Sequence, residues 1–398
     1  MAVCAVNACS PADGSSGAVE VIDSAGATIV VSHGPRWADG AGWSVPSEPR
    51  VTIGVFDGTK EYELFNVRAA ARQSDGDFVV VDGGTREVRL YDRDGTYIRA
   101  FGGYGSGPGE FRNPTQVLVS GFDDVVVWDD AIFRITRFDS AGSLVSVRSV
   151  DRGQIAKAIE PPLYPGMGHL VQDDLVLIRL VEKTGKGVGS GVSRRRSGAF
   201  RVSADVSRVD TLMFFGDNEE VSVESPWGRT LVAPPLARTT VMAVQPALSE
   251  VCLGDQARPE ITCFGPDGSR TVIRWESESE PVREEEVAAW LEKTVDLWST
   301  KVSEDIARRT LAQVVPPETR PHYSRVTLDR VGNLWVERGR VEPLSESVEH
   351  LVFDPSGALL GVVALPPMEI LDIGEDYIMG IHRDELDIEY VQMFDIVK

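Results

Sequence analysis

The sequence predicts an all-β fold, a six-bladed β-propeller built from four-stranded antiparallel blades. One observation is a short pattern, an acidic or amide turn followed by an apolar strand, that recurs six times along the chain. Another is an aromatic residue followed by Asp or Gly that trails these copies, as in Tyr91-Asp92 and Phe264-Gly265. The composition supports the same class, because Val, Thr, Gly and turn pairs are abundant whereas helix-favouring runs are scarce.

The copies of the turn–strand pattern set the size of the repeating unit. Their intervals are 43 to 50 residues, except for two intervals of 76 and 83 residues that contain insertions. Four short strands in roughly 40–50 residues are typical of one propeller blade. The copies are DGDFVVVD (75–82), FDDVVVWD (122–129), QDDLVLIR (172–179), LSEVCLGD (248–255), VGNLWVER (331–338) and GEDYIMGI (374–381).

Residues 1–17 are expected to form a leader or tether, and residues 18–398 a single propeller. The segment Val6-Asn7-Ala8-Cys9 loosely resembles a lipobox, in which small residues precede a Cys that is lipidated after cleavage. The basic and long apolar regions of a signal peptide are missing from this sequence. Two alternatives therefore stay open: a truncated lipoprotein signal anchored at Cys9, and a frayed N-terminus with an incidental Cys. The first predicts an exported protein, periplasmic or on the outer surface.

The N-terminal region is also expected to close the ring. The chain ends at Lys398, soon after the pair Phe394-Asp395, which leaves the sixth blade without its fourth strand. An unpaired edge strand invites aggregation, and closure removes it. The candidates are ATIVVS (27–32) and RVTIGV (50–55), and the second is favoured because a degraded copy of a Gly-rich linker follows it. The first is then an extra strand or hairpin nearby.

The Gly-rich segment FGGYGSGPGEFRNP, residues 101–114, is interpreted as the crossover between two blades. A phosphate-binding loop places its glycines between a strand and a helix and closes on Lys-Ser/Thr, whereas this segment runs into Pro114 and another strand. Together with the strand VVVWD and the turn FDSAG it resembles an NHL-type propeller repeat. Asp129, Arg134 and Phe138 match the family's Asp, Arg and aromatic positions, and in the preceding blade Asp82 matches while Glu87 replaces the Arg.

The NHL-type resemblance covers about residues 65–150, and the other blades share only its hydrophobic rhythm. It implies a propeller of the kind found in exported and scaffold proteins.

One helix is predicted, over about 282–315, as an insertion (281–316) between blades four and five. Apolar residues there recur at three- and four-residue steps, from Val287 to Ile306, and form one stripe. Pro281 and Glu284–Glu286 favour its start, and Val315-Pro316-Pro317 ends it. The insertion either covers one side of the propeller or serves as a lid or docking helix.

Cys252 and Cys263 flank a turn and would lie opposite each other if Asp255 pairs with Glu260. A cross-strand disulfide in an oxidising compartment and a pair of buried free thiols are the two alternatives. Two cysteines eleven residues apart without a nearby His do not make a zinc site.

The candidate site lies at the mouth of the axial channel and on the loop face. Counting eleven residues back from the acidic or amide residue that anchors each copy, such as Asp77, places six residues there: Asn66, Asn113, Leu163, Thr239, His322 and Leu365. Asn66, Asn113 and His322 could converge with Asp82, Asp129 or Asp255. Such oxygen-rich groups suit Ca²⁺, and the arrangement is similar to six-bladed lactonases of the gluconolactonase and paraoxonase type, in which it activates water or polarises a carbonyl. The alternative is that these side chains only bond the starts of strands.

The sequence favours an extracytoplasmic propeller without a cofactor that binds a protein or cell-envelope ligand through its loop face. A Ca²⁺-dependent lactonase or hydrolase with Asn66, Asn113 and His322 near the ion is the alternative. The net charge of −21 argues against nucleic acid as a partner. The one basic run, Arg194–Arg196, is interpreted as a solvated loop tip. A lipidated N-terminus is the only expected membrane attachment.

Overall fold

Strands dominate the computed structural model of the chain, which describes residues 17–38, 40–159, 163–172, 175–182, 192–339 and 347–398. The described strands form several four-stranded antiparallel sheets and two larger ones, with three helices beside them. The all-β prediction is confirmed, and this arrangement is of the propeller type. The proposed leader and its Cys9 fall almost entirely outside the described residues.

Four sheets have four antiparallel strands each. Three are meanders of consecutive strands. The first has β4 (Val67–Arg72), β5 (Phe78–Asp82), β6 (Glu87–Tyr91) and β7 (Tyr97–Gly102); the second has β8 (Pro114–Val119), β9 (Val125–Asp129), β10 (Arg134–Phe138) and β11 (Leu144–Ser149); the third has β21 (Tyr323–Leu328), β22 (Leu334–Arg338), β23 (Val348–Phe353) and β24 (Leu359–Leu365).

The fourth of these sheets joins the two ends of the chain. It contains β25 (Glu369–Ile373), β26 (Tyr377–Arg383) and β27 (Glu389–Asp395), and β3 (Val51–Ile53) pairs antiparallel with β27. Residues 50–55, the segment favoured from the sequence, thus supply the fourth strand of this sheet. The sheet has no free edge at β27.

The remaining two sheets are larger. One has five strands: β12 (Leu163–Gln172), β13 (Leu175–Glu182), β14 (Val192–Ser203), β15 (Val209–Ser225) and β16 (Gly228–Val232). The other contains β17 (Thr240–Gln245), β18 (Glu250–Asp255), β19 (Glu260–Phe264) and β20 (Arg270–Trp275), and it is extended by the hairpin β1 (Val19–Ser24) and β2 (Ala27–Ser32). Strand β2 runs parallel to β20, as an extra hairpin beside the repeat.

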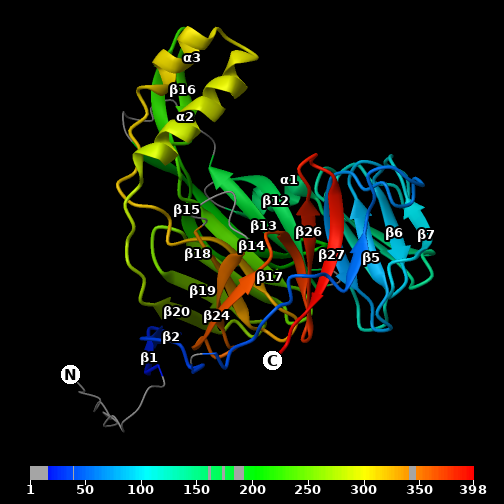
Figure 1. Ribbon diagram of the computed structural model, residues 1–398. Helices are drawn as coiled ribbons and strands as arrows, with labels where there is room; N and C mark the ends of the chain where they lie inside the picture. The colour runs from blue at the N-terminus through cyan, green and yellow to red at the C-terminus, as the bar shows by residue number, and fades with distance from the viewer. Residues whose placement is uncertain (1–16, 39, 160–162, 173–174, 183–191, 340–346) are drawn as a thin grey trace.

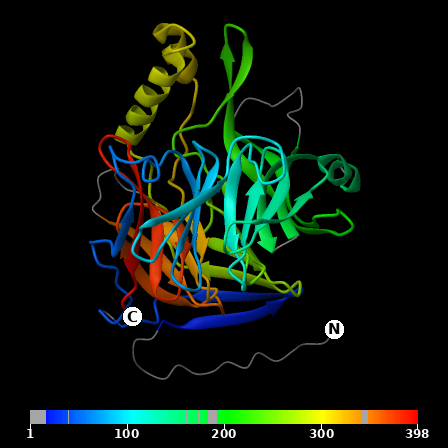
Figure 2. The same cartoon turned by 90° about the vertical axis from the view of Figure 1, so that its right-hand side faces the viewer.

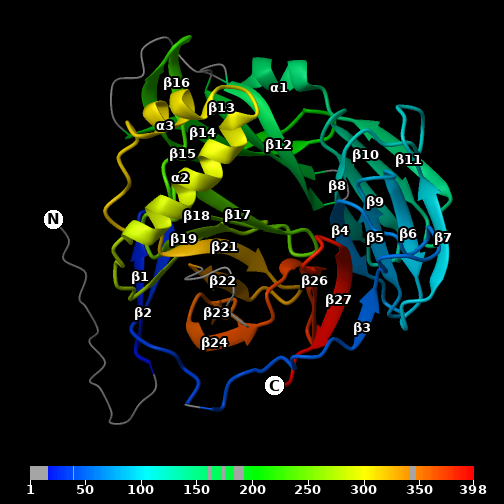
Figure 3. The same cartoon turned by 45° about the horizontal axis from the view of Figure 1, so that its top comes forward.

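Neighbouring sheets pack face to face through shared apolar clusters. The second strands β5 and β9 are buried from end to end, because both of their faces contact other sheets. Figure 3 shows the sheets following one another around a common centre. Pairs that share a cluster across successive sheets are Ile53 with Val80, Val79 with Val127, Trp128 with Leu170, Val171 with Leu253, Ile273 with Val336, and Trp335 with Ile378.

An arm rises from this body, formed by the outer part of the β15–β16 hairpin with α2 (Glu284–Ser299) and α3 (Glu304–Leu311) (Figures 1 and 2). It has its own apolar cluster. Val221 and Val223 from β15 pack there with Val295 of α2 and Leu311 of α3, all of them buried. A short α1 (Arg152–Ala158), which the sequence did not predict, precedes β12.

The prediction of one helix over 282–315 is wrong in one respect, since two helices occupy the segment. Helix α2 ends at Ser299, and Ser303 begins the next helix with extended backbone. This break lets Val302 turn into the cluster of the arm beside Leu311. Of the described helices, none is long and apolar enough to cross a membrane.

The interpretation of the basic run as a loop tip is also wrong. Arg194–Arg196 lie within β14, where Arg194 pairs with Asp255 (Nη1–Oδ2 2.7 Å) and Arg195 with Glu220 (Nη2–Oε1 3.3 Å). Carboxylates neutralise the charges of Arg194 and Arg195, and the guanidinium of Arg196 lies over the ring of Phe214, so the run is part of the sheet.

Candidate functional site

The loop face is the end of the sheets at which the second and third strands are joined and the chain crosses to the next sheet. In the first meander, Val67 pairs with Asp82, Asp82 with Glu87, and Glu87 with Gly102. The start of β4, the β5–β6 turn and the end of β7 therefore lie at this one end. The linker after Gly102 begins here.

The carboxylates of Asp82 and Asp129 hold the turns of the loop face in place through hydrogen bonds to the backbone. Both are fully buried. Asp82 accepts hydrogen bonds from the backbone N–H groups of Phe65 (3.1 Å) and Thr85 (2.8 Å). Asp129 likewise accepts from the backbone N–H groups of Arg112 (2.6 Å) and Asn113 (3.2 Å). Each carboxylate thereby fixes the residues that precede a first strand, including two side chains, Phe65 and Arg112, that point to solvent.

Arg134 and Arg89 make comparable contacts in the second and first meanders. Arg134 donates through Nη1 to the carbonyl of Ser106 (2.9 Å) in the linker before its own sheet. In the preceding sheet Arg89, two residues after Glu87, donates to the carbonyl of Glu63 (2.9 Å) and pairs with Asp82 (Nη2–Oδ2 3.6 Å). Arg89 thus does there what Arg134 does in its sheet.

The ring of Tyr104 in the Gly-rich linker contacts two arginines. The guanidinium carbons of Arg86 and Arg112 are 4.9 Å and 4.7 Å from the centroid of its ring, and Arg112 also donates to the tyrosine hydroxyl. Backbone contacts hold the group together, since Arg86 Nε donates to the carbonyl of Arg112 (3.2 Å) and Gly103 N–H to that of Arg86 (2.9 Å). A guanidinium over an aromatic face is favourable by about 0.5–1 kcal/mol at an exposed site.

Phe65 and Arg68 border the same group. Phe65 has 73% of its surface exposed and packs against Gly84, whose carbonyl accepts from Arg86 Nη1 (2.9 Å). The side chain of Arg68 packs beside Gly83 of the same turn. We call these five residues the arginine–tyrosine patch: Phe65, Arg68, Arg86, Tyr104 and Arg112.

The patch is cationic in a chain whose net charge is −21. Among the residues that the structure describes, no carboxylate lies within ion-pair distance of Arg68, Arg86 or Arg112. Other arginines differ, since Arg194 is paired with Asp255 and Arg320 with Glu286. The unpaired guanidinium N–H groups of the patch remain available to an external anion.

A second feature is a cleft of about 270 Å³ at the foot of the arm. The chain leaves the sheet for the arm through Trp275, Glu276 and Ser277, and it returns at His322. Ser277 Oγ lies 3.0 Å from His322 Nδ1. His33, after β2, contacts Glu276 across the opening (Nδ1–Oε1 2.8 Å).

Burial lowers the pKa of His322 below its ordinary value, and the charge of Arg238 acts in the same direction. The imidazole is therefore neutral at pH 7 and can accept a proton. Its backbone N–H is fixed by the carbonyl of the buried Gln256 (3.0 Å).

The residues proposed from the sequence have other partners in the structure. Asn113 is bonded through its backbone to Asp129, Asn66 lies in a left-handed turn whose carbonyl accepts from Gly83 (3.0 Å), and His322 faces Ser277. These are separate hydrogen-bond networks, and Asp82 and Asp129 use their oxygens on backbone N–H groups. The set does not fit a shared Ca²⁺ site, and we derive no chemistry through one.

Two other positions at the channel mouth need comment. Leu365 is the last residue of β24 and does not begin a first strand, because the first strand of the last sheet, β25, starts at Glu369, nearer to Asp376 than the eleven-residue count assumes. The side chain of Leu163 lies outside the described residues.

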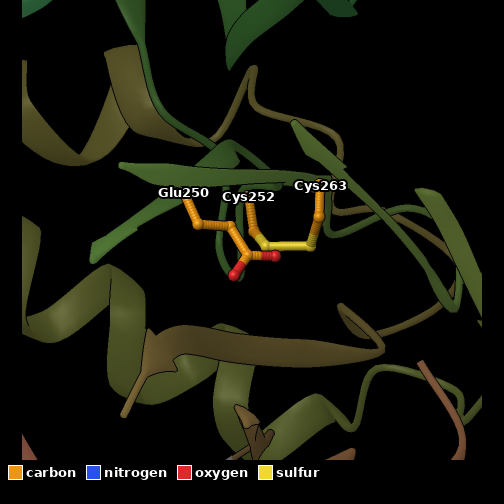
Figure 4. A group of neighbouring side chains, drawn as sticks. All are labelled: Glu250, Cys252 and Cys263. Carbon is orange, nitrogen blue, oxygen red and sulfur yellow. A yellow bond between two sulfur atoms is a disulfide. The ribbon is translucent and has the colours of Figure 1, made fainter. Parts of the chain in front are cut away.

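Cys252 and Cys263 lie opposite each other on β18 and β19 and form a disulfide (Figure 4). With Glu250 they are the one group of potential metal ligands found close together among the described residues. The disulfide removes both thiolates, so this group is not a metal site in the oxidised chain. Figure 4 shows the Glu250 carboxylate beneath the disulfide. Burial raises the pKa of Glu250.

Comparison with solved structures finds propeller-type proteins. A candidate exported protein of Bacteroides fragilis is 12% identical with TM-score 0.46, covering 93% of this chain and 99% of that one. A DUF4221 family member from Bacteroides vulgatus is 8% identical with TM-score 0.49 (89% and 99% covered), and a gluconolactonase of Xanthomonas campestris is 13% identical with TM-score 0.40 (85% and 88%). No protein-family model and no curated protein matches the sequence. Likeness this distant gives no ground for transferring a function.

The sequence reasoning missed Arg86, Tyr104 and Arg112 as a group, and it missed Ser277. Tyr104 and Arg112 belong to the linker that it examined for glycines alone. A crossover needs only small residues, so the presence of an aromatic residue and an arginine in it could have indicated a binding role. Ser277 gives no such signal, because its partner follows a long insertion.

Proposed function

We propose that this chain is an extracytoplasmic six-bladed propeller that binds an acidic protein or cell-envelope ligand through the arginine–tyrosine patch on its loop face. The observation that carries the proposal is the stack of Arg86, Tyr104 and Arg112 without a carboxylate partner in the described residues. Planar guanidinium groups bind carboxylates and phosphates bidentately, and aromatic and arginine side chains are the commonest hot spots of interfaces.

The six sheets support the proposed blade count. Each shares an apolar cluster with the next, and β3 joins the last sheet to the N-terminal part of the chain. A closed ring is a rigid scaffold, on which loops can carry binding residues without loss of the core.

The Cys252–Cys263 disulfide supports the proposed location. Both cysteines are buried, with 0% and 5% of their surface exposed. Disulfides persist in oxidising compartments and are rare in the cytosol of mesophiles. An extracytoplasmic setting agrees with this chemistry.

Binding of two polyanions tests the proposal. Fluorescein-labelled poly-L-glutamate presents carboxylates and labelled polyphosphate presents phosphates, so the pair also identifies the preferred group. The double variant Arg86→Ala/Arg112→Ala should lose about tenfold or more in affinity, which corresponds to about 1.4 kcal/mol. Raising the salt concentration should weaken the remaining binding, since exposed charges are screened.

The control double variant also removes two arginines, but at the end of the sheets that lies away from the loop face. Arg93 follows β6 and Arg270 begins β20, and both are exposed and lie away from the loop face. Arg93→Ala/Arg270→Ala should bind as the parent does. Equal losses in the two double variants, or no binding by the parent, would refute a specific site at the patch.

A further inference from the structure

The cleft at the foot of the arm brings a hydroxyl and an imidazole together from distant parts of the chain. Ser277 lies two residues beyond the end of β20, and His322 directly precedes β21. Between them the two connections to the arm run side by side: Val282 N–H donates to the carbonyl of Glu318 (3.1 Å) and Arg320 N–H to that of Glu280 (2.8 Å). This pairing holds Ser277 and His322 at a fixed separation.

Charged side chains lock the same connections. The guanidinium of Arg320, with only 8% of its side chain exposed, contacts the carboxylates of Glu280 (3.5 Å) and Glu286 (Nε–Oε2 3.1 Å). Glu286 belongs to the first turn of α2, so its contact with Arg320 also holds α2 against the two connections. The 3.0 Å contact between Ser277 Oγ and His322 Nδ1 is therefore built on an ordered support.

The lining of the cleft suits a small, partly apolar molecule. Trp275, Leu351 and Leu359 are buried and provide an apolar wall, while Arg338 contributes a guanidinium at the exposed side. A volume of about 270 Å³ lies just under the range of roughly 300–1,000 Å³ for ligand sites. A short-chain ester is of the right size.

We propose that Ser277 and His322 are a nucleophile and general base that transfer the acyl group of a small ester bound in this cleft. The hydroxyl touches an imidazole nitrogen, which is the arrangement that activates a serine. The neutral state of His322 at pH 7 agrees with the role of a base. This activity is separate from binding at the arginine–tyrosine patch and does not depend on it.

The reaction proceeds in two balanced halves. Ser277 Oγ forms a bond to the ester carbonyl carbon while its proton moves to His322 Nδ1; the bond to the alkoxy oxygen then breaks, and that proton leaves with the alcohol. Water next attacks the acyl-serine, giving its proton to His322, and the carboxylic acid departs as the proton returns to Ser277 Oγ. The sum is ester plus water giving acid plus alcohol, with no oxidant or cofactor.

The test uses the full chain with two probes, diisopropyl fluorophosphate as a covalent label and p-nitrophenyl acetate as an ester. Peptide mapping after labelling should find one adduct, on Ser277. Ser277→Ala should abolish both the adduct and the hydrolysis above background. His322→Gln should slow labelling by about 100-fold, the usual contribution of a general base. Ser277→Cys should keep measurable acyl transfer.

Ser279 provides a matched control, because it is an exposed serine two residues away on the same connection. Ser279→Ala should label and hydrolyse as the parent does. An adduct spread over several serines, its absence from Ser277, or an unchanged labelling rate in His322→Gln would overturn the proposal. Ser277 and Ser279 are both exposed, so their alanine variants keep the fold and the comparison stands even if His322→Gln is unstable.

Discussion

The backbone of Ile53 is paired with that of Val391, so a strand near the start of the chain forms the edge of the last sheet. Ile53 also shares an apolar cluster with Val80 of the first meander and with Met379 and Met393 of the last sheet. One short strand thus ties two sheets together, by hydrogen bonds to one and by apolar contact with the other.

A designed crosslink checks this pairing. Thr52 lies opposite Gln392, so Thr52→Cys/Gln392→Cys, made in a Cys4→Ser/Cys9→Ser background, should form a disulfide under air oxidation. A crosslink that closes a long loop should raise the free energy of unfolding by about 2–4 kcal/mol. The control pair Glu20→Cys/Gln392→Cys should stay reduced, because β1 lies on another sheet. Crosslinking in the control alone would contradict the assigned pairing.

Replacing glycines of the Gly-rich linker should lower the stability of the fold. Gly109 has φ +82°, a left-handed conformation that costs an L-residue about 1–2 kcal/mol. Gly109→Val should lower the free energy of unfolding by at least that amount in urea titrations. Gly121→Val, at a position with open space and ordinary φ, should change it much less. Equal effects would show that the turn does not need its glycine.

The arm should unfold separately from the sheets. Leu311→Ala removes a side chain that is 1% exposed from the arm's cluster, a change that typically costs about 2–5 kcal/mol. Hydrogen exchange over 284–311 should accelerate, while exchange in β9 stays slow. Leu297→Ala, on the exposed side of α2, should leave both unchanged. Faster exchange in β9 would mean that the arm is part of the main core.

The disulfide should contribute measurably to stability. Cys252→Ala/Cys263→Ala should reduce the free energy of unfolding by about 2–3 kcal/mol, as expected for a loop of this length. Denaturant titrations of the parent and the variant, both without reductant, measure the difference. A variant as stable as the parent would contradict a structural role.

Glu250 should make stability depend on pH. Its folded pKa is raised by burial above the ordinary 4.5, so the folded state binds the proton more tightly than the unfolded state. That contribution is present below pH 4.5 and is lost as pH rises through the folded pKa. Glu250→Gln should therefore melt higher than the parent at pH 7 and lose this advantage at about pH 4. The exposed Glu278→Gln should follow the parent at both values.

The local turn–strand pattern of the sequence predicted the strands well, but it did not predict which side chains meet in the fold. The copies at Asp77 and Asp124 gave β5 and β9 because a short apolar run between turns has few other solutions. The extension of β15 into the arm could not be predicted from the sequence. Beyond Gly216 its residues alternate between polar and apolar, and the apolar side is buried only because α2 and α3 cover it.

Contacts between distant residues were beyond sequence reasoning. Arg86 and Tyr104 meet because the β5–β6 turn and the linker after β7 lie at the same end of one sheet. Ser277 and His322 meet because the paired connections of the arm bring its two ends together. Asn66, Asn113 and His322 share a position in the repeat, yet each has different hydrogen-bond partners.

Hydrogen–deuterium exchange with and without poly-L-glutamate locates the bound anion on the chain and so tests whether the arginine–tyrosine patch is the binding site. We expect slower exchange in the presence of poly-L-glutamate over residues 103–113 and 83–86, at low salt, with no change over 276–281 or in the exposed turns at 92–96 and 265–269. Protection confined to any other surface, or none at saturating poly-L-glutamate, would contradict the assignment of the arginine–tyrosine patch as the binding site.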